Sequence, residues 1–154
     1  MISKDEFLNR SSSALEEIYD MINDSKTINI KDLEPNNTAL IIVDMINGFV
    51  REGMLKSSRV EGIIPDIINI SKACDELGMA KIAFADSHTE ASPEFHSYPV
   101  HCIRGTSEEQ IVDEIKKVGG YKLISKNSAN GFLEEEFQLW LAVGIYSYKN
   151  RVIC

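Results

Sequence analysis

The chain has 154 residues, 44% of them hydrophobic, which is enough for one globular domain with a core of its own. Twenty-four acidic and sixteen basic residues give a net charge of −8, which argues against nucleic acid and anionic membranes as partners. No apolar run approaches the roughly twenty residues that span a bilayer, and the amino terminus lacks the apolar stretch of a signal peptide.

The amino-terminal part of the chain predicts one long helix followed by a connector. Residues 4–23 place apolar side chains at helical spacing, and Ser3 with Glu6 forms the capping box that opens such a helix. A polar stretch with a Pro-Asn-Asn turn follows. We therefore expect residues 1–37 to form a helix and connector, and residues 38–154 to form the main domain.

From residue 39 onward, short apolar runs alternate with amphipathic segments. Strands are predicted at residues 39–45, 80–86 and 121–126. Helices are predicted at residues 65–77, between Pro65 and Gly78; at residues 107–118, opened by a capping box of Thr106 and Glu109; and at residues 133–142. This alternation predicts an α/β fold, a three-layer and mainly parallel sheet with helices on both faces.

Three ionisable residues stand where the predicted strands end, namely Asp44, Asp86 and Lys126. In parallel α/β sheets, ligands bind outside the carboxyl ends of the strands. The sequence therefore predicts a functional site at this edge of the sheet.

The three histidines of the chain lie close together, just after the second predicted strand. Asp86 and His88 are two residues apart, so their side chains point to the same side of an extended backbone. His101 follows a loop and can return to the same place, while His96 is a weaker candidate. One carboxylate and two imidazoles suit a divalent transition metal ion and leave positions for water or substrate. The alternative is that Asp86 caps a loop and that the histidines lie on its surface.

Asp44 and Lys126 also allow two interpretations. Asp44 could be an N-cap or loop carboxylate, and Lys126 could be a solvated lysine at a strand end, with no role in chemistry. Alternatively, the two face each other and form a proton-transfer pair, in which the ammonium keeps the acid ionised. Such a pair needs a nucleophile, for which a cysteine thiol is the usual choice.

Three segments of the chain resemble, in order, the signature regions of the isochorismatase-like cysteine hydrolases. They are TALIIVDMINGF (38–49), FADSHTEASPEFHSYPVHCIRGT (84–106) and ISKNSANGF (124–132). The Asp-x-His and Pro-x-His-Cys arrangement of the second segment resembles the nicotinamidase/pyrazinamidase branch in particular. The resemblance covers residues 38 to about 140 and implies the matching fold.

The resemblance implies hydrolysis of an amide by a cysteine. Asp44 would be the general base that takes the thiol proton, and Lys126 would stabilise the ionised state and the developing oxyanion. The thiolate would attack the amide carbon, release ammonia and leave an acyl-enzyme for water to hydrolyse.

The resemblance also implies the ligands of the substrate pocket. A divalent metal, for which zinc is the expected ion, would be held by Asp86, His88 and His101 and would orient the pyridine ring of nicotinamide. Phe49 matches an aromatic residue that lines this pocket, although packing in the core is an equal alternative. Ile46 departs from the family pattern, in which many relatives carry a glutamine.

No cysteine stands where the family nucleophile is expected, after a strand well beyond the lysine. Cys102 matches the His-Cys position of the motif, and Cys74 lies on a predicted helix, so both are interpreted as packing residues. We expect the domain to be incomplete at its carboxyl end, as a frameshift near residue 142 would leave it. The alternative is that residues 147–154 form the next strand and that Cys154 reaches the site.

Four functions therefore stay open. They are a metal-assisted cysteine amidohydrolase resembling nicotinamidase, a truncated homologue that keeps the metal site without turnover, a metal-free isochorismatase-type hydrolase, and a binding module whose amino-terminal helix contacts a partner. The first implies a small-molecule amide as partner, and a homo-oligomer, which the family often forms. An odd number of cysteines without CxxC spacing argues for a reducing, cytoplasmic environment.

Overall fold

The computed structural model describes residues 2–145 and 152–153, and its internal contacts divide the chain into two units, Met1–Asp32 and Leu33–Cys154. The first unit contains helix α1 (Lys4–Asn23), which matches the predicted helix. Ser3 Oγ accepts a hydrogen bond from the Glu6 backbone N–H at 3.1 Å, as the capping box predicts.

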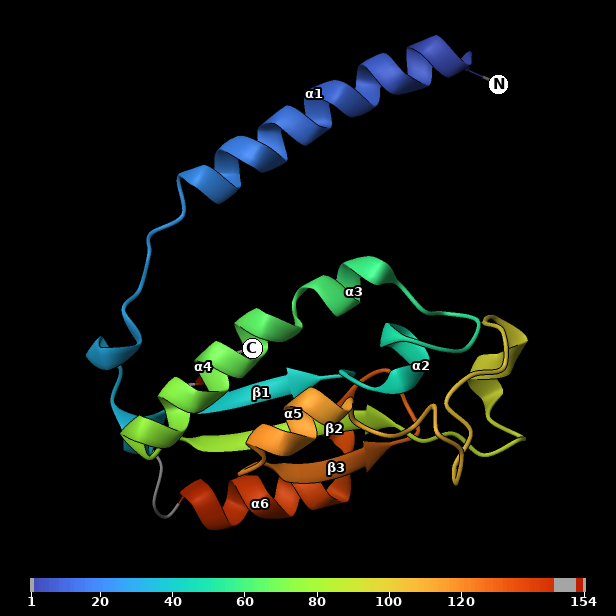
Figure 1. The fold of residues 1–154 in the computed structure, drawn as a ribbon. Coiled ribbons are helices and arrows are strands. Elements are labelled where there is room, and N and C mark those ends of the chain that lie inside the picture. The colour runs from blue at the N-terminus through green and yellow to red at the C-terminus, as the bar shows by residue number, and fades with distance from the viewer. Residues whose placement is uncertain (1, 146–151, 154) are drawn as a thin grey trace. The chain divides into compact units, whose positions relative to one another are not determined.

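The second unit is built on a parallel sheet with the strand order β3-β2-β1-β4 (Figure 1). The strands are β1 (Ala39–Val43), β2 (Ala80–Asp86), β3 (Lys122–Lys126) and β4 (Val152–Ile153). The first three agree with the predicted strands to within two residues. β1 and β2 pair along the full length of β1, from Ala39 opposite Ala80 to Val43 opposite Phe84.

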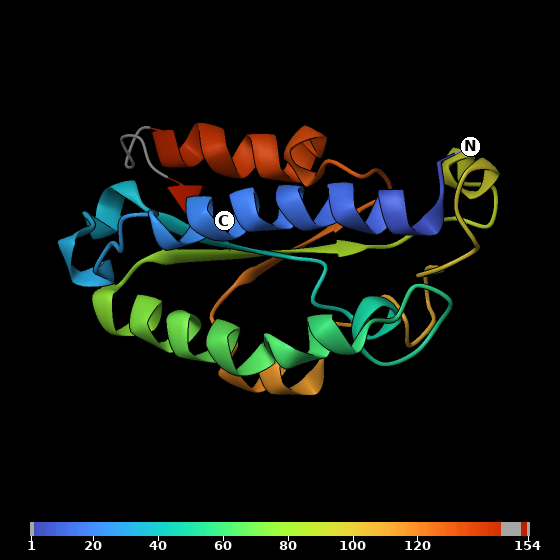
Figure 2. The same cartoon turned by 90° about the horizontal axis from the view of Figure 1, so that it is seen from above.

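Helices cover both faces of this sheet, so the predicted three-layer α/β fold is confirmed (Figure 2). One face carries α4 (Ile64–Leu77) and α5 (Asp113–Val118), and the other carries α6 (Glu135–Ile145). Short helical segments lie in the connections: α2 (Asn47–Val50), α3 (Ser58–Gly62) and 3-10 turns at residues 30–32, 35–37, 93–96 and 131–133.

The core on the α6 side is formed by alternate residues of the strands. Ile41, Ile82, Phe84 and Ile124 are almost completely buried and pack against Phe137 of α6. The Phe84 and Phe137 rings lie 5.4 Å apart in a tilted arrangement that aromatic pairs favour. This packing stabilises β1, β2 and β3. Because these strands are parallel and adjacent, their carboxyl ends meet at one edge of the sheet.

The helix predicted at residues 107–118 is wrong in its first half, because α5 begins only at Asp113. Glu109 does not complete a capping box with Thr106. Its carboxylate instead accepts a hydrogen bond from the Gly105 backbone N–H at 2.7 Å and one from Ser87 Oγ at 2.5 Å.

The backbone of residues 108–112 bonds to the segment that follows β1. The Gly48 N–H donates to the Glu108 carbonyl at 2.9 Å, and the Val112 N–H donates to the Met45 carbonyl at 3.0 Å. These long-range hydrogen bonds hold residues 108–112 as a loop against the segment that follows β1, at the carboxyl edge of the sheet.

The tail of the chain contributes the short strand β4, in which Val152 lies opposite Ala39 and Ile153 lies opposite Leu40. The alternative that this tail forms a further strand therefore holds for residues 152–153. Cys154 lies outside the described residues, and no strand beyond β4 occurs among those that are described. None of the helices described is long and apolar enough to cross a membrane.

Candidate metal and proton-transfer site

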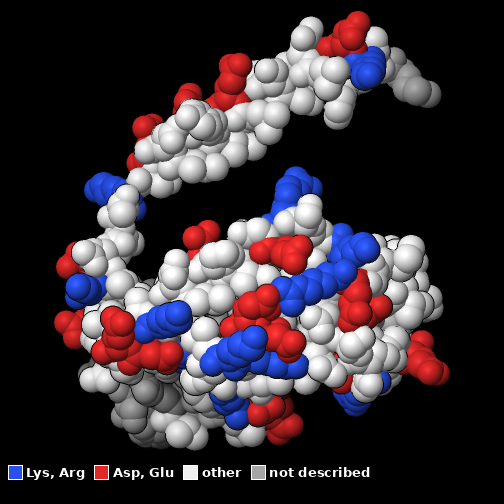
Figure 3. All heavy atoms as spheres, viewed as in Figure 1, with Lys and Arg blue, Asp and Glu red and all other residues white. Residues whose placement is uncertain are grey.

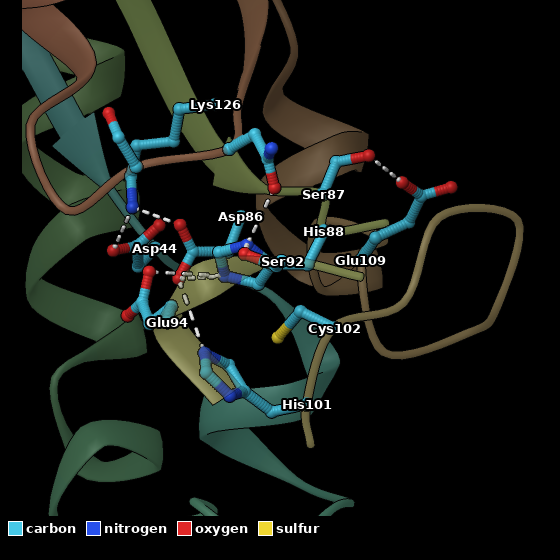
Figure 4. A network of polar contacts seen from close by, with 12 residues as sticks. Asp44, Asp86, Ser87, His88, Ser92, Glu94, His101, Cys102, Glu109 and Lys126 are labelled. Carbon is cyan, nitrogen blue, oxygen red and sulfur yellow. Dashed lines mark hydrogen bonds and ion pairs between the residues drawn. The ribbon is translucent and has the colours of Figure 1, made fainter. Parts of the chain in front are cut away.

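Asp44, Asp86 and Lys126 meet at the carboxyl ends of β1, β2 and β3 (Figure 4). Lys126 Nζ lies 3.0 Å from Asp44 Oδ2 and also donates a hydrogen bond to Asp86 Oδ1. The structure thus brings together the three residues that the strand ends predicted, and Asp44 and Lys126 face each other.

The backbone after β1 turns sharply at Asp44. Its φ of 56° lies in the left-handed region, which aspartate tolerates better than most residues. The Asp44 N–H still donates to the Phe84 carbonyl at 3.0 Å, so the turn begins immediately after the last pairing with β2. This turn directs the carboxylate toward Lys126.

Burial and mutual charge set the protonation of this group. Burial, followed by the negative charge of Asp86, raises the pKa of Asp44 above its ordinary value, and Lys126 opposes this rise. Burial lowers the pKa of Lys126, but the hydrogen bond to Asp86 and the charge of Asp44 outweigh it, so this pKa is raised. Two carboxylates around one ammonium give this group a net negative charge, which favours the binding of a cation nearby.

A second cluster, here called the Asp-His-His group, consists of Asp86, His88 and His101. All three residues are buried, and one potential ligand atom from each lies within 4.8 Å of the others. Asp86 Oδ2 lies 3.6 Å from His88 Nε2 and 3.8 Å from His101 Nε2. The residues predicted to bind a metal are therefore adjacent and directed at a common point.

The hydrogen bonds behind the two imidazoles leave their Nε2 atoms for a ligand. His101 Nδ1 lies 2.7 Å from the Pro99 carbonyl, which can only accept, and His88 Nδ1 lies 3.0 Å from Asn127 Oδ1. A neutral imidazole that donates from Nδ1 has a lone pair on Nε2. His88 Nε2 is buried and has no hydrogen-bond partner among the residues described, so this donor set fits a divalent metal ion.

A histidine and an acid nearby differ in their relation to this group. His96 is exposed at the end of a 3-10 turn and does not belong to the group. Glu94 faces it, with Oε2 at 3.8 Å from His88 Nε2, and sequence reasoning missed this residue. It lies in the 3-10 turn Pro93–His96, which is too short to carry a periodic signal that could have indicated it.

Aromatic rings flank the two imidazoles. The Phe49 ring centre lies 5.6 Å from that of His101, and Phe95 lies 5.4 Å from His88 and 5.6 Å from His101. Phe49 therefore lies beside His101, and Phe95 is a second aromatic residue there that the sequence did not indicate. Ile46 is fully buried and bridges to Ile111, so it packs inside the protein.

The two described cysteines are free thiols buried in the protein interior. Burial, together with the charges of Asp86 and Glu108, raises the pKa of Cys102 to about 12, and burial raises the pKa of Cys74. Both are therefore protonated at neutral pH and poor nucleophiles. The Cys102 backbone adopts a left-handed φ of 48°, and its N–H donates to the Glu108 carboxylate at 2.8 Å.

The fold and the site together define an α/β protein with a candidate metal centre at the edge of its parallel sheet. The chain belongs to the isochorismatase family, whose isochorismatase domain it matches over residues 38–145. Within that family it is similar to the nicotinamidase branch. It is 32% identical to Nicotinamidase 1 of Arabidopsis thaliana over 133 residues, which are 77% of this chain and 53% of that protein. The chain spans about half the length of the curated relatives it matches.

Solved structures share the fold. N-carbamoylsarcosine amidase from Thermoplasma acidophilum superposes with a TM-score of 0.67 at 22% identity, over 75% of this chain and 65% of that one. The pyrazinamidase of Pyrococcus horikoshii in complex with zinc superposes with a TM-score of 0.59 at 25% identity, over 75% of this chain and 68% of that one.

Proposed function

We propose that this site serves a metal-dependent amidohydrolase that acts on nicotinamide or a closely related carboxamide. One observation carries the proposal: the buried Asp-His-His group lies directly against the Asp44–Lys126 pair, with Asp86 shared between them. A cation site and a proton-transfer pair at one sheet edge are the two parts that such a reaction needs. The names of the relatives, a nicotinamidase and a zinc-bound pyrazinamidase, support the same substrate class.

Zinc is the ion that we assign to the Asp-His-His group, because two imidazoles and one carboxylate are ligands that it accepts with positions left open. When bound, it would supply a Lewis acid that holds and orients the ring nitrogen of the substrate. Phe49 and Phe95 would provide an apolar wall for the ring beside the imidazoles.

The Asp44–Lys126 pair performs the proton chemistry in this proposal. Asp44 accepts the proton of the attacking thiol, for which its raised pKa is suited. Cys154 is the cysteine left for this role, because Cys74 and Cys102 are buried and protonated. Lys126 remains an ammonium next to the reacting carbonyl and stabilises the negative charge that develops on its oxygen.

The hydrolase domain in this proposal begins at about residue 38, where the family match begins. We assign it to the cytoplasm, for which the two free thiols of Cys74 and Cys102 are suited. Its partner is a small carboxamide, and assembly into a homo-oligomer is part of the proposal.

A second candidate is a homologue that binds the metal without turnover. It is favoured by the cysteines, because Cys74 and Cys102 are buried and protonated.

Ammonia release from nicotinamide by the zinc-loaded chain distinguishes the two candidates. The amidohydrolase releases ammonia, and a Lys126→Met variant releases far less because it lacks the ammonium beside the carbonyl. A Cys154→Ser variant, measured in parallel, tests the third cysteine as the nucleophile. A chain that binds one zinc per molecule but releases no ammonia contradicts the amidohydrolase and supports the second candidate.

Isochorismate serves as the competing substrate in the same assay. A metal-free isochorismatase-type hydrolase would consume isochorismate in the presence of a chelator and leave nicotinamide unchanged. That result would contradict both the substrate class and the role of the Asp-His-His group.

A further inference from the structure

Helix α1 exposes a large apolar face that the hydrolase proposal does not use. None of its residues is buried, and its large apolar side chains are between about half and three-quarters exposed. They are Phe7, Leu8, Leu15, Ile18, Tyr19, Met21 and Ile22. So many exposed apolar side chains on one helix indicate a contact surface.

These side chains follow a heptad spacing. Leu8, Leu15 and Ile22 recur every seven residues, with Ile18 between them, as in the contact seam of paired helices. The acids of α1 lie away from this seam, and Figure 3 shows them along one side of the helix. An isolated helix of this length is only marginally stable in water, so a partner helix would also stabilise α1.

The seam varies in size along its length. Ser11 and Ala14 are small, whereas Ile18, Tyr19, Met21 and Ile22 are bulky, and Phe7 and Leu8 add two bulky side chains near the amino-terminal end. In an antiparallel pair of identical helices centred between residues 16 and 17, the bulky residues 18–22 lie against residues 11–15 of the partner. In a parallel pair, the bulky residues would meet each other and Ser11 would lie against Ser11, which would leave a gap.

The charges favour the same orientation. In the first half of α1, Lys4 and Arg10 balance Asp5 and Glu6, while the second half carries three acids and no cation: Glu16, Glu17 and Asp20. A parallel pair would place the acidic halves side by side. An antiparallel pair places each acidic half beside a neutral one and also aligns the helix dipoles favourably.

We propose that α1 is a homodimerisation helix, which pairs antiparallel with α1 of a second copy of this chain. The two-fold axis passes between residues 16 and 17, so that Leu15 lies against Ile18 of the other copy and Ser11 lies against Ile22. This pairing buries the apolar side chains between Ala14 and Ile22 and does not depend on the proposed reaction.

Sedimentation of the full chain tests the pairing. The chain should sediment at twice its mass of 17.3 kDa at micromolar concentration. A Leu15→Glu variant, which places a charge in the seam, should sediment as a monomer. Ser13→Glu adds the same charge on the opposite face and should leave the dimer intact. A wild-type chain that stays monomeric, or a Leu15→Glu variant that still dimerises, overturns the proposal.

Disulfide trapping tests the orientation with one seam position changed in each chain. Ser11→Cys and Ile22→Cys chains, each also carrying Cys154→Ser, are oxidised separately and as a mixture. The antiparallel pair cross-links only the mixture, because like positions lie about 16 Å apart along the axis, beyond the reach of a disulfide. Cross-linking of either chain with itself, or of neither preparation, overturns the antiparallel pair.

Discussion

Lys126 is an ammonium buried between two carboxylates, with only 1% of its side chain exposed. We predict that Lys126→Met lowers the free energy of unfolding by about 3–5 kcal/mol in the presence of a chelator, because both carboxylates lose their counter-charge. Urea unfolding followed by circular dichroism measures this loss.

Lys122 provides the matched control on the same strand. Its ammonium lies 2.7 Å from Glu136, but both side chains are substantially exposed, at 40% and 54%. Lys122→Met should therefore cost no more than about 1 kcal/mol. Equal losses for the two variants would show that burial does not matter to the Lys126 pairs.

Glu108 does not belong to the Asp-His-His group but supports its geometry. Its carboxylate holds the Cys102 N–H at 2.8 Å, and that left-handed residue directly follows His101. We predict that Glu108→Ala weakens zinc binding by about tenfold or more, as loss of supporting hydrogen bonds does at other metal sites. Competition with a zinc indicator measures the change in affinity.

Two further variants show whether the effect comes from the hydrogen bond that Glu108 accepts or from the loss of its negative charge. Glu108→Gln retains an acceptor and should recover part of the affinity. Glu90→Ala removes an exposed acid from the same connection and should have no effect. If Glu90→Ala weakens binding as much as Glu108→Ala does, the net charge of the loop is responsible.

The residues of the site were predictable to different degrees. Asp44, Asp86 and Lys126 could be found because the carboxyl ends of parallel strands always meet at one edge. Glu94 and Phe95 could not, because they lie in a single 3-10 turn, which is too short to show a periodic pattern in the sequence.

Among the elements, the strands were more predictable than the helix after the metal loop. β2 has the predicted bounds, since an uninterrupted apolar run is determined by burial on both faces. The helix at residues 107–118 was predicted too early, because Glu109 bonds to Gly105 and Ser87 and does not cap a helix. A capping pattern indicates only local bonding, which distant partners override here.

Gly131, in the turn after β3, contacts a core ring closely. A Cβ added there would overlap the Phe84 ring in the core against α6. We predict that Gly131→Ala lowers the free energy of unfolding by about 1–3 kcal/mol through overpacking. Urea unfolding of the purified variant measures this loss.

Gly62, the last residue of α3, is the matched control. A Cβ at this position would meet nothing within 4 Å. Gly62→Ala should leave stability unchanged or raise it by up to about 1 kcal/mol, because the unfolded chain loses freedom. A destabilised Gly62→Ala would contradict the attribution of the Gly131 effect to its contact with Phe84.

At the scale of the whole molecule, a metal that binds only the folded chain should stabilise it. We predict that zinc at about 100 times its Kd adds about 2.7 kcal/mol to the free energy of unfolding, and that a chelator removes this increment. Thermal unfolding with and without zinc measures it. His101→Ala should abolish the increment, and His96→Ala should retain it, because His96 is exposed outside the Asp-His-His group.

The overall architecture followed from the alternation of strands and helices, whereas the pairing of the tail did not. Among the described residues, β4 pairs with β1 at Ala39 and Leu40 through Val152 and Ile153, two good strand formers that follow a largely polar stretch. Two residues are too few for a pattern of burial, so only the finished sheet determines where they pair.

Asp86 directs one carboxylate oxygen to Lys126 and the other to the two imidazoles. The two parts of the site are therefore thermodynamically linked, and a cation on one side must change the free energy of the ion pair on the other by an equal and reciprocal amount. In a double-mutant cycle, the changes in the free energy of unfolding caused by substituting Lys126 and His101 should then be strongly non-additive, although the two side chains need not touch. A change that weakens one part of the site should therefore weaken the other part as well.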